Sequence, residues 1–115
     1  HFADFGVAPV QDRALRDLLT TAVGAGAKPA LLLMPESPWF RGLYPPGGRD
    51  AVRAYVAALG REHGAAVFDA SDWVSDEDAF TDGHHLLGPA AEAFSRRLGR
   101  DALGPWLGVP PRGGD

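Results

Sequence analysis

The run Ala30-Leu31-Leu32-Leu33-Met34 most constrains the fold, because it is apolar throughout and shows no alternation of polar and apolar residues. A short continuous apolar run is typical of a strand that is covered on both faces, as in a parallel sheet. Pro35 predicts the end of this strand. A second short apolar run, residues 65–68, predicts another strand of the same kind. We therefore expect a parallel sheet whose strands are connected by helices.

Three segments with helical periodicity surround these two runs. The first covers residues 10–23, where apolar side chains repeat at helical spacing and Gly24 and Gly26 predict the end. The second begins after residue 48, and Gly60 or Gly64 predicts its end. The third opens with Gly88-Pro89, because proline favours the first turn of a helix, and Gly99 predicts its stop. The order helix–strand–helix–strand–helix predicts an α/β fold with right-handed crossovers.

The predicted elements fit one α/β domain over residues 1–115, with residues 1–9 as an extended lead-in and residues 103–115 as an irregular tail. Two strands make a poor sheet, because such a pair is not expected to be stable alone. A fully apolar strand also needs neighbours on both sides. We therefore expect the chain to be the carboxyl-terminal part of a larger sheet. An upstream segment of the same protein or a partner chain would complete that sheet.

The composition excludes several classes of function. The net charge of −4 comes without a basic stripe, which argues against nucleic-acid binding. The longest apolar run is far too short to cross a bilayer. The absence of cysteine excludes disulfides and thiol catalysis within this chain. None of these features indicates a cellular compartment.

The proline-rich loop of residues 35–48 follows the first predicted strand and is rich in polar and aromatic side chains. Open α/β sheets bind their ligands in loops at the carboxyl ends of parallel strands. We therefore predict that four of its side chains face substrate: Glu36, Ser37, Arg41 and Tyr44. The alternative is a loop whose Trp39 and Phe40 cover the core and whose Arg41 is solvated.

The second polar loop contains Asp82-Gly83-His84-His85 just before the third predicted helix. General-base chemistry needs an imidazole held in one tautomer by an acceptor on its second nitrogen, and Asp is the usual acceptor. The spacing therefore predicts His85 as a base and Asp82 as its orienting carboxylate, with His84 as the competing base. The alternative is that Asp82 only stabilises an Asp-Gly turn while His85 helps to cap the next helix.

A metal site is a further alternative, because Asp82, His84 and His85 lie near several acidic residues in the sequence. However, no two histidines have the spacing that places both on one helix face, and cysteine ligands are absent. The acidic stretch of residues 69–82 also lacks the glycine and the closing glutamate of a calcium loop. We therefore predict no metal site and no cofactor, and interpret the acidic stretch as a solvated loop. The acidic residues that could add ligands to such a site are Glu36, Asp76, Glu77 and Asp78.

Residues 31–38, 67–69 and 80–88, together with Phe94, resemble the SGNH (GDSL-like) hydrolase superfamily. The similarity is to its acyltransferase-like bacterial branches, such as the D-alanyl-transfer and alginate acetylation proteins, and it covers roughly residues 10–100. In that superfamily an Asp-x-x-His block precedes the final helix. The resemblance therefore implies a flavodoxin-like α/β/α sandwich in which His85 is the base and Asp82 orients it.

The resemblance also implies the chemistry and its setting. It points to a serine esterase or O-acyltransferase that acts on acyl esters of carbohydrate or cell-envelope polymers, without a metal or an organic cofactor. A location in the cell envelope or outside the cytoplasm is implied by the resemblance alone.

The chain departs from the family in its nucleophile and its oxyanion hole. The family's serine lies in a Gly-Asp-Ser turn, which this chain lacks, and the chain contains no Asn for the oxyanion hole. Ser37 loosely mimics such a turn, but Pro35 and Pro38 remove the backbone donors that it would need. We therefore expect the nucleophile upstream. The rival expectation is a non-catalytic carbohydrate- or protein-binding module that keeps the fold and binds through Trp39, Arg41 and Tyr44.

Overall fold

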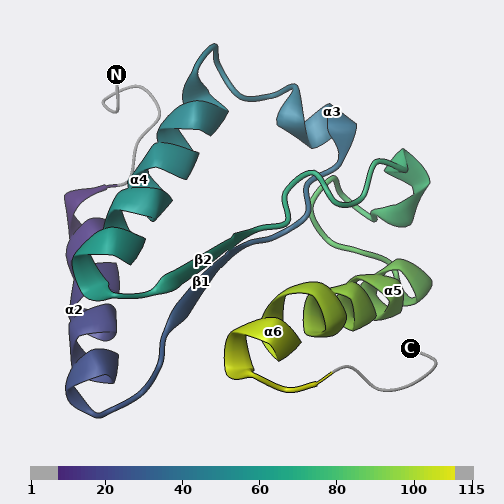
Figure 1. Cartoon of the computed structure of the whole chain (residues 1–115). Helices are drawn as coiled ribbons and strands as arrows, with labels where there is room; N and C mark the ends of the chain where they lie inside the picture. Colours follow the sequence, from purple (N-terminus) through teal and green to yellow (C-terminus); the bar gives the residue numbers. More distant parts are fainter. Residues whose placement is uncertain (1–7, 111–115) are drawn as a thin grey trace. The chain divides into compact units, whose positions relative to one another are not determined.

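The computed structural model describes residues 8–110, which form a mixed α/β structure with a short parallel sheet (Figure 1). These residues group into two compact units. The first unit comprises residues 8–33 and 41–69, and the second comprises residues 34–40 and 70–110. The α/β class is confirmed. The elements in chain order are α2 (Pro9–Gly24), β1 (Ala30–Leu33), α3 (Pro38–Arg41), α4 (Gly48–His63), β2 (Ala66–Asp69), the 3₁₀ turn η1 (Glu77–Ala79), α5 (Gly88–Leu98), the π-helical turn η2 (Gly99–Leu103) and α6 (Gly104–Leu107).

The sheet of the first unit has two parallel strands, β1 and β2, with Ala30 paired to Ala66 and Leu33 to Asp69. The connecting helix α4 packs on both strands and on α2. The strands run one residue differently from the prediction: Met34 lies outside β1 and is 52% exposed, while β2 begins at Ala66. The leucines of β1 are only half-buried. The expectation that both faces are covered is therefore not met within the described residues. Each strand also has only one neighbouring strand there.

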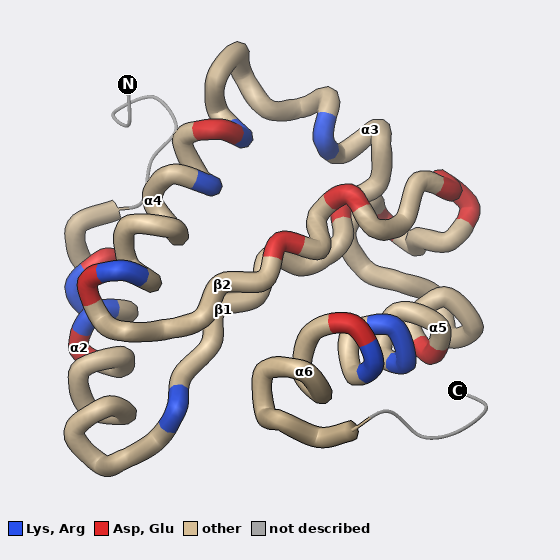
Figure 2. Tube along the Cα trace, in the orientation of Figure 1, with Lys and Arg blue, Asp and Glu red and all other residues tan. Residues whose placement is uncertain are grey.

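A polar network joins α2 to α4 above the buried side chains Leu19 and Leu59. The Tyr55 hydroxyl donates to Asp12 Oδ1 at 2.5 Å, and the Arg16 guanidinium donates to both Asp12 and Glu62. Burial, followed by the bond to Asp12, raises the pKa of Tyr55 to about 12. In turn, the Tyr55 hydrogen bond holds the pKa of Asp12 below its ordinary value. Figure 2 shows charged residues along both helices.

Gly60 allows α4 to approach β2 closely. A Cβ at this position would lie 2.6 Å from Val67 Cγ2 and 2.9 Å from the Ala65 carbonyl oxygen. Gly60 therefore serves packing inside the helix. The helix ends instead at Gly64, whose φ of +65° is the left-handed conformation of a typical C-cap. This settles the two predicted ends in favour of Gly64.

The second unit contains the longest departure from the predicted elements. Gly99 does not stop the third helix, because its φ of −62° and ψ of −47° continue the helical path into η2 and α6. Gly104 makes this continuation possible, since a Cβ there would lie 2.8 Å from the Gly99 carbonyl oxygen. The predicted irregular tail is therefore helical up to Leu107. Residues 1–7 of the lead-in and 111–115 of the tail lie outside the described residues.

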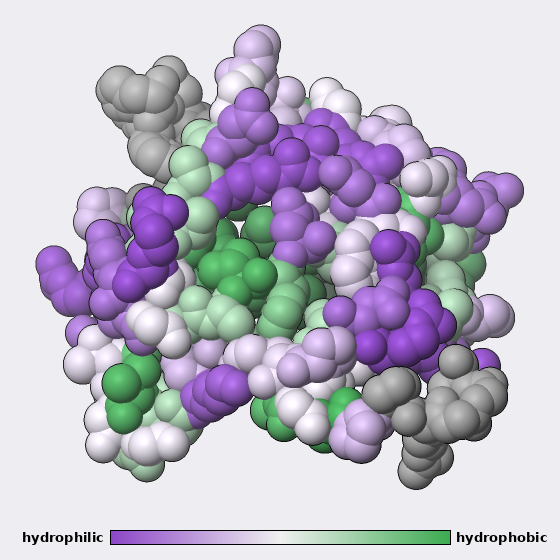
Figure 3. Space-filling view, viewed as in Figure 1, coloured by the Kyte–Doolittle hydropathy of each residue, from purple (hydrophilic) through white to green (hydrophobic). Residues whose placement is uncertain are grey.

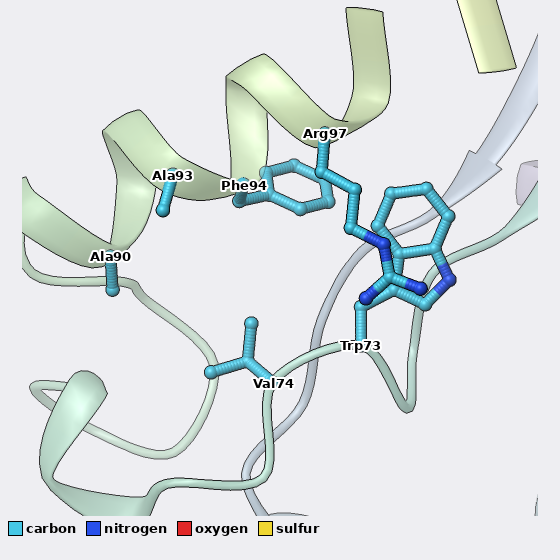
Figure 4. A pocket seen from close by; sticks show the side chains of 6 residues that line it. All are labelled: Trp73, Val74, Ala90, Ala93, Phe94 and Arg97. Atoms are coloured by element: carbon cyan, nitrogen blue, oxygen red, sulfur yellow. The ribbon is translucent and has the colours of Figure 1, made fainter. Parts of the chain in front are cut away.

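A small apolar groove runs along α5 in the same unit, with a volume of about 190 Å³ (Figure 4). The Trp73 ring packs edge-on against Phe94 at 5.8 Å, and the Arg97 guanidinium covers the Trp73 ring at 4.1 Å. Val74 faces Ala90 and Ala93 across the groove. Trp73 is thus a packing residue in its own unit.

Apolar side chains also reach the surface of the first unit. Val10, Leu18 and Val23 on α2 are all exposed, and the face drawn in Figure 3 shows apolar and polar side chains side by side over this helix. Within residues 8–110, no helix has both the length and the apolar character that crossing a membrane requires.

Replacing Tyr55 with Phe is expected to reduce the alkaline sensitivity of folding. Because the folded protein holds the Tyr55 proton more tightly than the unfolded chain does, this interaction stabilises fully below about pH 10. The stabilisation is lost as the pH rises from 10 towards the folded pKa of about 12. Urea midpoints measured between pH 8 and pH 11.5 should fall more steeply for wild type than for Tyr55→Phe. Parallel curves would show that the Asp12–Tyr55 bond is not made in solution.

Replacing Gly60 with Ala is expected to destabilise the protein by about 1–3 kcal/mol, because the added methyl group overlaps Val67 and backbone of the following loop. Gly24 is a suitable control, since a Cβ there meets no atom within 4 Å. Gly24→Ala should leave the free energy of unfolding unchanged within about 0.5 kcal/mol. Equal effects of the two substitutions in urea denaturation would refute the close approach.

Candidate catalytic dyad

The segment Asp82–His85 forms a closed turn in the second unit. Phe80 and Leu86 pair as an isolated antiparallel bridge on either side of it. The Thr81 amide donates to the His85 carbonyl oxygen at 2.8 Å, which closes the turn. Gly83 lies inside with a φ of +88°, a conformation that other residues rarely adopt. The Asp-Gly pair of the sequence thus forms the turn that it predicts.

The Asp82 carboxylate uses its two oxygens for different tasks. Oδ1 accepts the backbone amides of His85 at 2.9 Å and His84 at 3.3 Å, which shapes the turn. Oδ2 lies 2.6 Å from His85 Nδ1. A carboxylate at this distance holds the neutral imidazole with its proton on Nδ1 and leaves the lone pair on Nε2. One side chain therefore stabilises the turn and also orients the imidazole, while no side chain in residues 8–110 caps α5. The role of His85 as a base stays a prediction.

Asp82 is set up to remain ionised. Its hydrogen bond with the His85 side chain is the main factor that lowers the pKa of Asp82, and the backbone amides of His84 and His85 add to it, while partial desolvation opposes them. An ionised carboxylate can stabilise the imidazolium that forms when His85 accepts a proton. The His85 side chain is 66% exposed, so a reacting group has access to it.

The chain segment after β1 contacts this turn through a hydrogen bond and through close packing. The Ser37 amide donates to the Gly83 carbonyl oxygen at 2.7 Å. A Cβ on Gly83 would lie 3.2 Å from Phe40 Cβ and 3.2 Å from Trp39 Cε3, so the turn packs closely on α3. Two further hydrogen bonds join the segment after β1 to the segment after β2. The Glu36 amide donates to the Ser71 carbonyl oxygen, and the Trp39 amide donates to Glu77 Oε1.

Ser37 does not face substrate in this arrangement. Its side chain is fully buried, and its hydroxyl accepts the Phe40 amide at 3.0 Å. This corrects the prediction of Ser37 as a substrate contact, because a side chain that caps α3 from inside cannot reach solvent. Burial also agrees with the conclusion from the flanking prolines that Ser37 is not the nucleophile.

The other predicted substrate contacts are less well defined. Glu36 is half-buried in the second unit. Arg41 and Tyr44 belong to the first unit, so their placement near Asp82 and His85 stays a prediction. The alternative interpretation of this loop, in which Trp39 covers the core, does not hold for Trp39, which is 61% exposed and adjoins Gly83.

His84 adds a second imidazole to the turn. Its ring lies 5.1 Å from the Phe40 ring and 4.1 Å from the His85 ring, and its Nδ1 is 3.6 Å from Asp82 Oδ1. This separation is too long for a hydrogen bond, so His85 and not His84 has the orienting carboxylate. Sequence reasoning missed the packing of His84 on Phe40. The only signal for it was the aromatic pair of residues 39 and 40 in the other loop.

Comparison with known proteins gives no further guide, since no protein-family model, curated protein or solved structure matches this chain. Function is therefore inferred from the geometry of the turn and from the resemblance of its motif.

Gly83→Ala is expected to open the turn. The substitution costs about 1–3 kcal/mol for the backbone conformation, and the new methyl group also presses on Phe40 and Trp39. Gly47 is a matched control, because its φ is +78° but a Cβ there meets no atom within 4 Å. Gly83→Ala should lower the urea midpoint more than Gly47→Ala does. It should also remove the low-field Nδ1–H signal of His85 in proton NMR. A retained signal would show that the bond between His85 Nδ1 and Asp82 does not depend on the closed turn.

Proposed function

We propose that Asp82 and His85 are the orienting carboxylate and general base of an SGNH-like serine esterase or O-acyltransferase acting on acyl esters. The observation that carries the proposal is the 2.6 Å separation of Asp82 Oδ2 and His85 Nδ1, on an imidazole that solvent can reach. The resemblance of residues 80–88 to the Asp-x-x-His block of the superfamily supports the same roles.

The reaction requires a serine from a segment upstream of these 115 residues. The serine hydroxyl attacks the acyl carbon of the ester while His85 Nε2 accepts its proton, and the charge of Asp82 stabilises the imidazolium. As the tetrahedral intermediate collapses, His85 returns the proton to the departing alcohol. Water or an acceptor hydroxyl then attacks the acyl-enzyme, again losing its proton to His85. The identity of this second nucleophile decides between hydrolysis and transfer.

A flavodoxin-like α/β/α sandwich is the finer fold that we propose for the complete domain. Two features support it: β1 and β2 are parallel, and α4 joins them as a crossover helix. The half-exposed leucines of β1 also favour additional strands from an upstream segment or a partner chain. Carbohydrate or cell-envelope polymer esters are the substrate class, and an extracytoplasmic location goes with them, on the resemblance alone.

A non-catalytic binding module is the second candidate, and the exposed indole of Trp39 favours it. An aromatic side chain that is 61% exposed can serve as a platform for a sugar ring. In such a module Trp39→Ala would abolish glycan binding, whereas His85→Ala would not change it. If the protein is an esterase or acyltransferase, His85→Ala should instead abolish its activity.

The deciding experiment uses the natural full-length protein with a fluorophosphonate probe and a p-nitrophenyl ester. His85→Ala and Asp82→Asn should each reduce the rates of labelling and ester turnover by at least about 10²-fold, since both disable the general base. His63→Ala is the control, because this imidazole bonds to the Leu59 carbonyl oxygen in the other unit and should leave the rates unchanged. Labelling that survives in His85→Ala would refute the proposal.

A further inference from the structure

The Asp82–His85 turn brings together more ligand atoms than a general base requires. Asp82, His84 and His85 each offer one oxygen or nitrogen, and these three atoms lie within 4.8 Å of one another. In residues 8–110, this is the cluster of histidine and acidic side chains with such a spacing. All three side chains are exposed, so a dissolved ion has direct access to them.

We propose that Asp82, His84 and His85 form a three-ligand binding site for a transition-metal dication, with Zn²⁺ as the ion that suits it best. Two imidazoles and one carboxylate are the ligands that Zn²⁺ commonly takes, and three protein ligands leave the fourth tetrahedral position to water. Mg²⁺ and Ca²⁺ prefer sites made of oxygen ligands only, so they should bind poorly here.

The ligand atoms must move to hold a tetrahedral ion, because the two contacts in the structure use different oxygens of Asp82. With bonds of about 2.0–2.1 Å to each ligand, two ligand atoms of a tetrahedral site are separated by about 3.3 Å. The His84 Nδ1 to Asp82 Oδ1 distance of 3.6 Å is close to this value. The 2.6 Å hydrogen bond between Asp82 Oδ2 and His85 Nδ1 must lengthen, since the ion takes the place of its proton.

The site is partly organised before an ion arrives. The Oδ1 atom of Asp82 already accepts the amides of both histidines, which fixes where the two side chains leave the backbone. Packing on Phe40 limits the freedom of the His84 ring, and the Ser37–Gly83 bond anchors the turn. A ligand set that is already ordered loses less conformational entropy on binding.

Metal binding and general-base catalysis compete for the same nitrogen. In the neutral imidazole of His85, the proton on Nδ1 leaves when the ion binds there, and Nε2 takes up one proton from solvent. The nitrogen that would accept the serine proton then carries hydrogen and has no lone pair to offer. The ion would therefore inhibit the enzyme. This consequence depends on the proposed function, whereas the binding of the ion does not.

The sequence predicts no metal site, because it contains no pair of histidines at the spacing of one helix face. Adjacent histidines on an extended strand would point in opposite directions. Here the turn brings their rings to 4.1 Å from each other. The turn thus brings together two histidines that helical spacing in the sequence does not predict to be close.

The test is calorimetric titration of the 115-residue chain with ZnCl₂, followed in parallel by histidine ¹H–¹⁵N NMR. We expect one ion per chain and shifted signals for both His84 and His85, with the proton of His85 moving to Nε2. His84→Ala should weaken binding at least tenfold, since even an outer-shell partner of a metal is worth about 10–100-fold. His84→Gln, which keeps a polar side chain, should weaken it as much. MgCl₂ should give no heat of binding.

The remaining histidines provide matched controls. His1→Ala and His63→Ala should bind Zn²⁺ as wild type does. The site is overturned if either control weakens binding as strongly as His84→Ala, or if His84→Ala binds as tightly as wild type. It is also overturned if wild type binds no ion at about 1 mM, a concentration that corresponds to roughly −4 kcal/mol.

Activity measurements separate this proposal from the proposed function. In the natural full-length protein, Zn²⁺ should slow ester turnover over the concentration range in which it binds to the turn. Binding without inhibition would overturn the role of His85 as the base and leave the metal site standing. Inhibition that persists in His84→Ala at the wild-type concentration would assign the effect to a different site.

Discussion

The turn of residues 82–85 depends on one carboxylate that accepts hydrogen bonds from the backbone and from a side chain at the same time. Asp82 Oδ1 accepts two amides of its own turn, and Oδ2 accepts from the imidazole at the end of that turn. The position of His85 and the tautomer of its ring therefore follow from a single ionised group. Removing that charge would disturb the shape of the turn together with the orientation of the His85 imidazole.

Elements with a strong apolar pattern, or with a proline or glycine at their ends, could be predicted from the sequence. The apolar run after Lys28-Pro29 and the proline at position 89 determine β1 and the start of α5 through local sterics and burial. Gly99 misled the prediction, because glycine only permits a left-handed stop and does not enforce one. Its φ and ψ are helical, and a Cβ on Gly104 would lie 2.8 Å from the Gly99 carbonyl oxygen, a close approach that no sequence pattern predicts.

The dyad itself was predictable because its geometry is local. Asp82 and His85 are three residues apart, so the Asp-Gly turn alone can join them. The support of the turn was not predictable, since it depends on the Ser37–Gly83 bond and on Phe40 beneath His84. These contacts join the segment that follows β1 to the segment that follows β2. Which residues of the two segments meet cannot be deduced from local sequence patterns. For the same reason Ser37, polar and within a loop, was mistaken for a group that faces substrate.

The two-stranded sheet of the first unit does not bury β1 as fully as its apolar sequence predicts. An uninterrupted apolar strand is selected where helices cover both faces and strands lie along both edges. In residues 8–110, β1 pairs only with β2, and its leucines are half-buried. The hydrogen bonds along its other edge can be made by a further parallel strand, and burial of the remaining leucine surface would contribute about 25 cal/mol per Å². A strand at that edge would therefore be stabilised by both contributions, as the apolar pattern of β1 predicts.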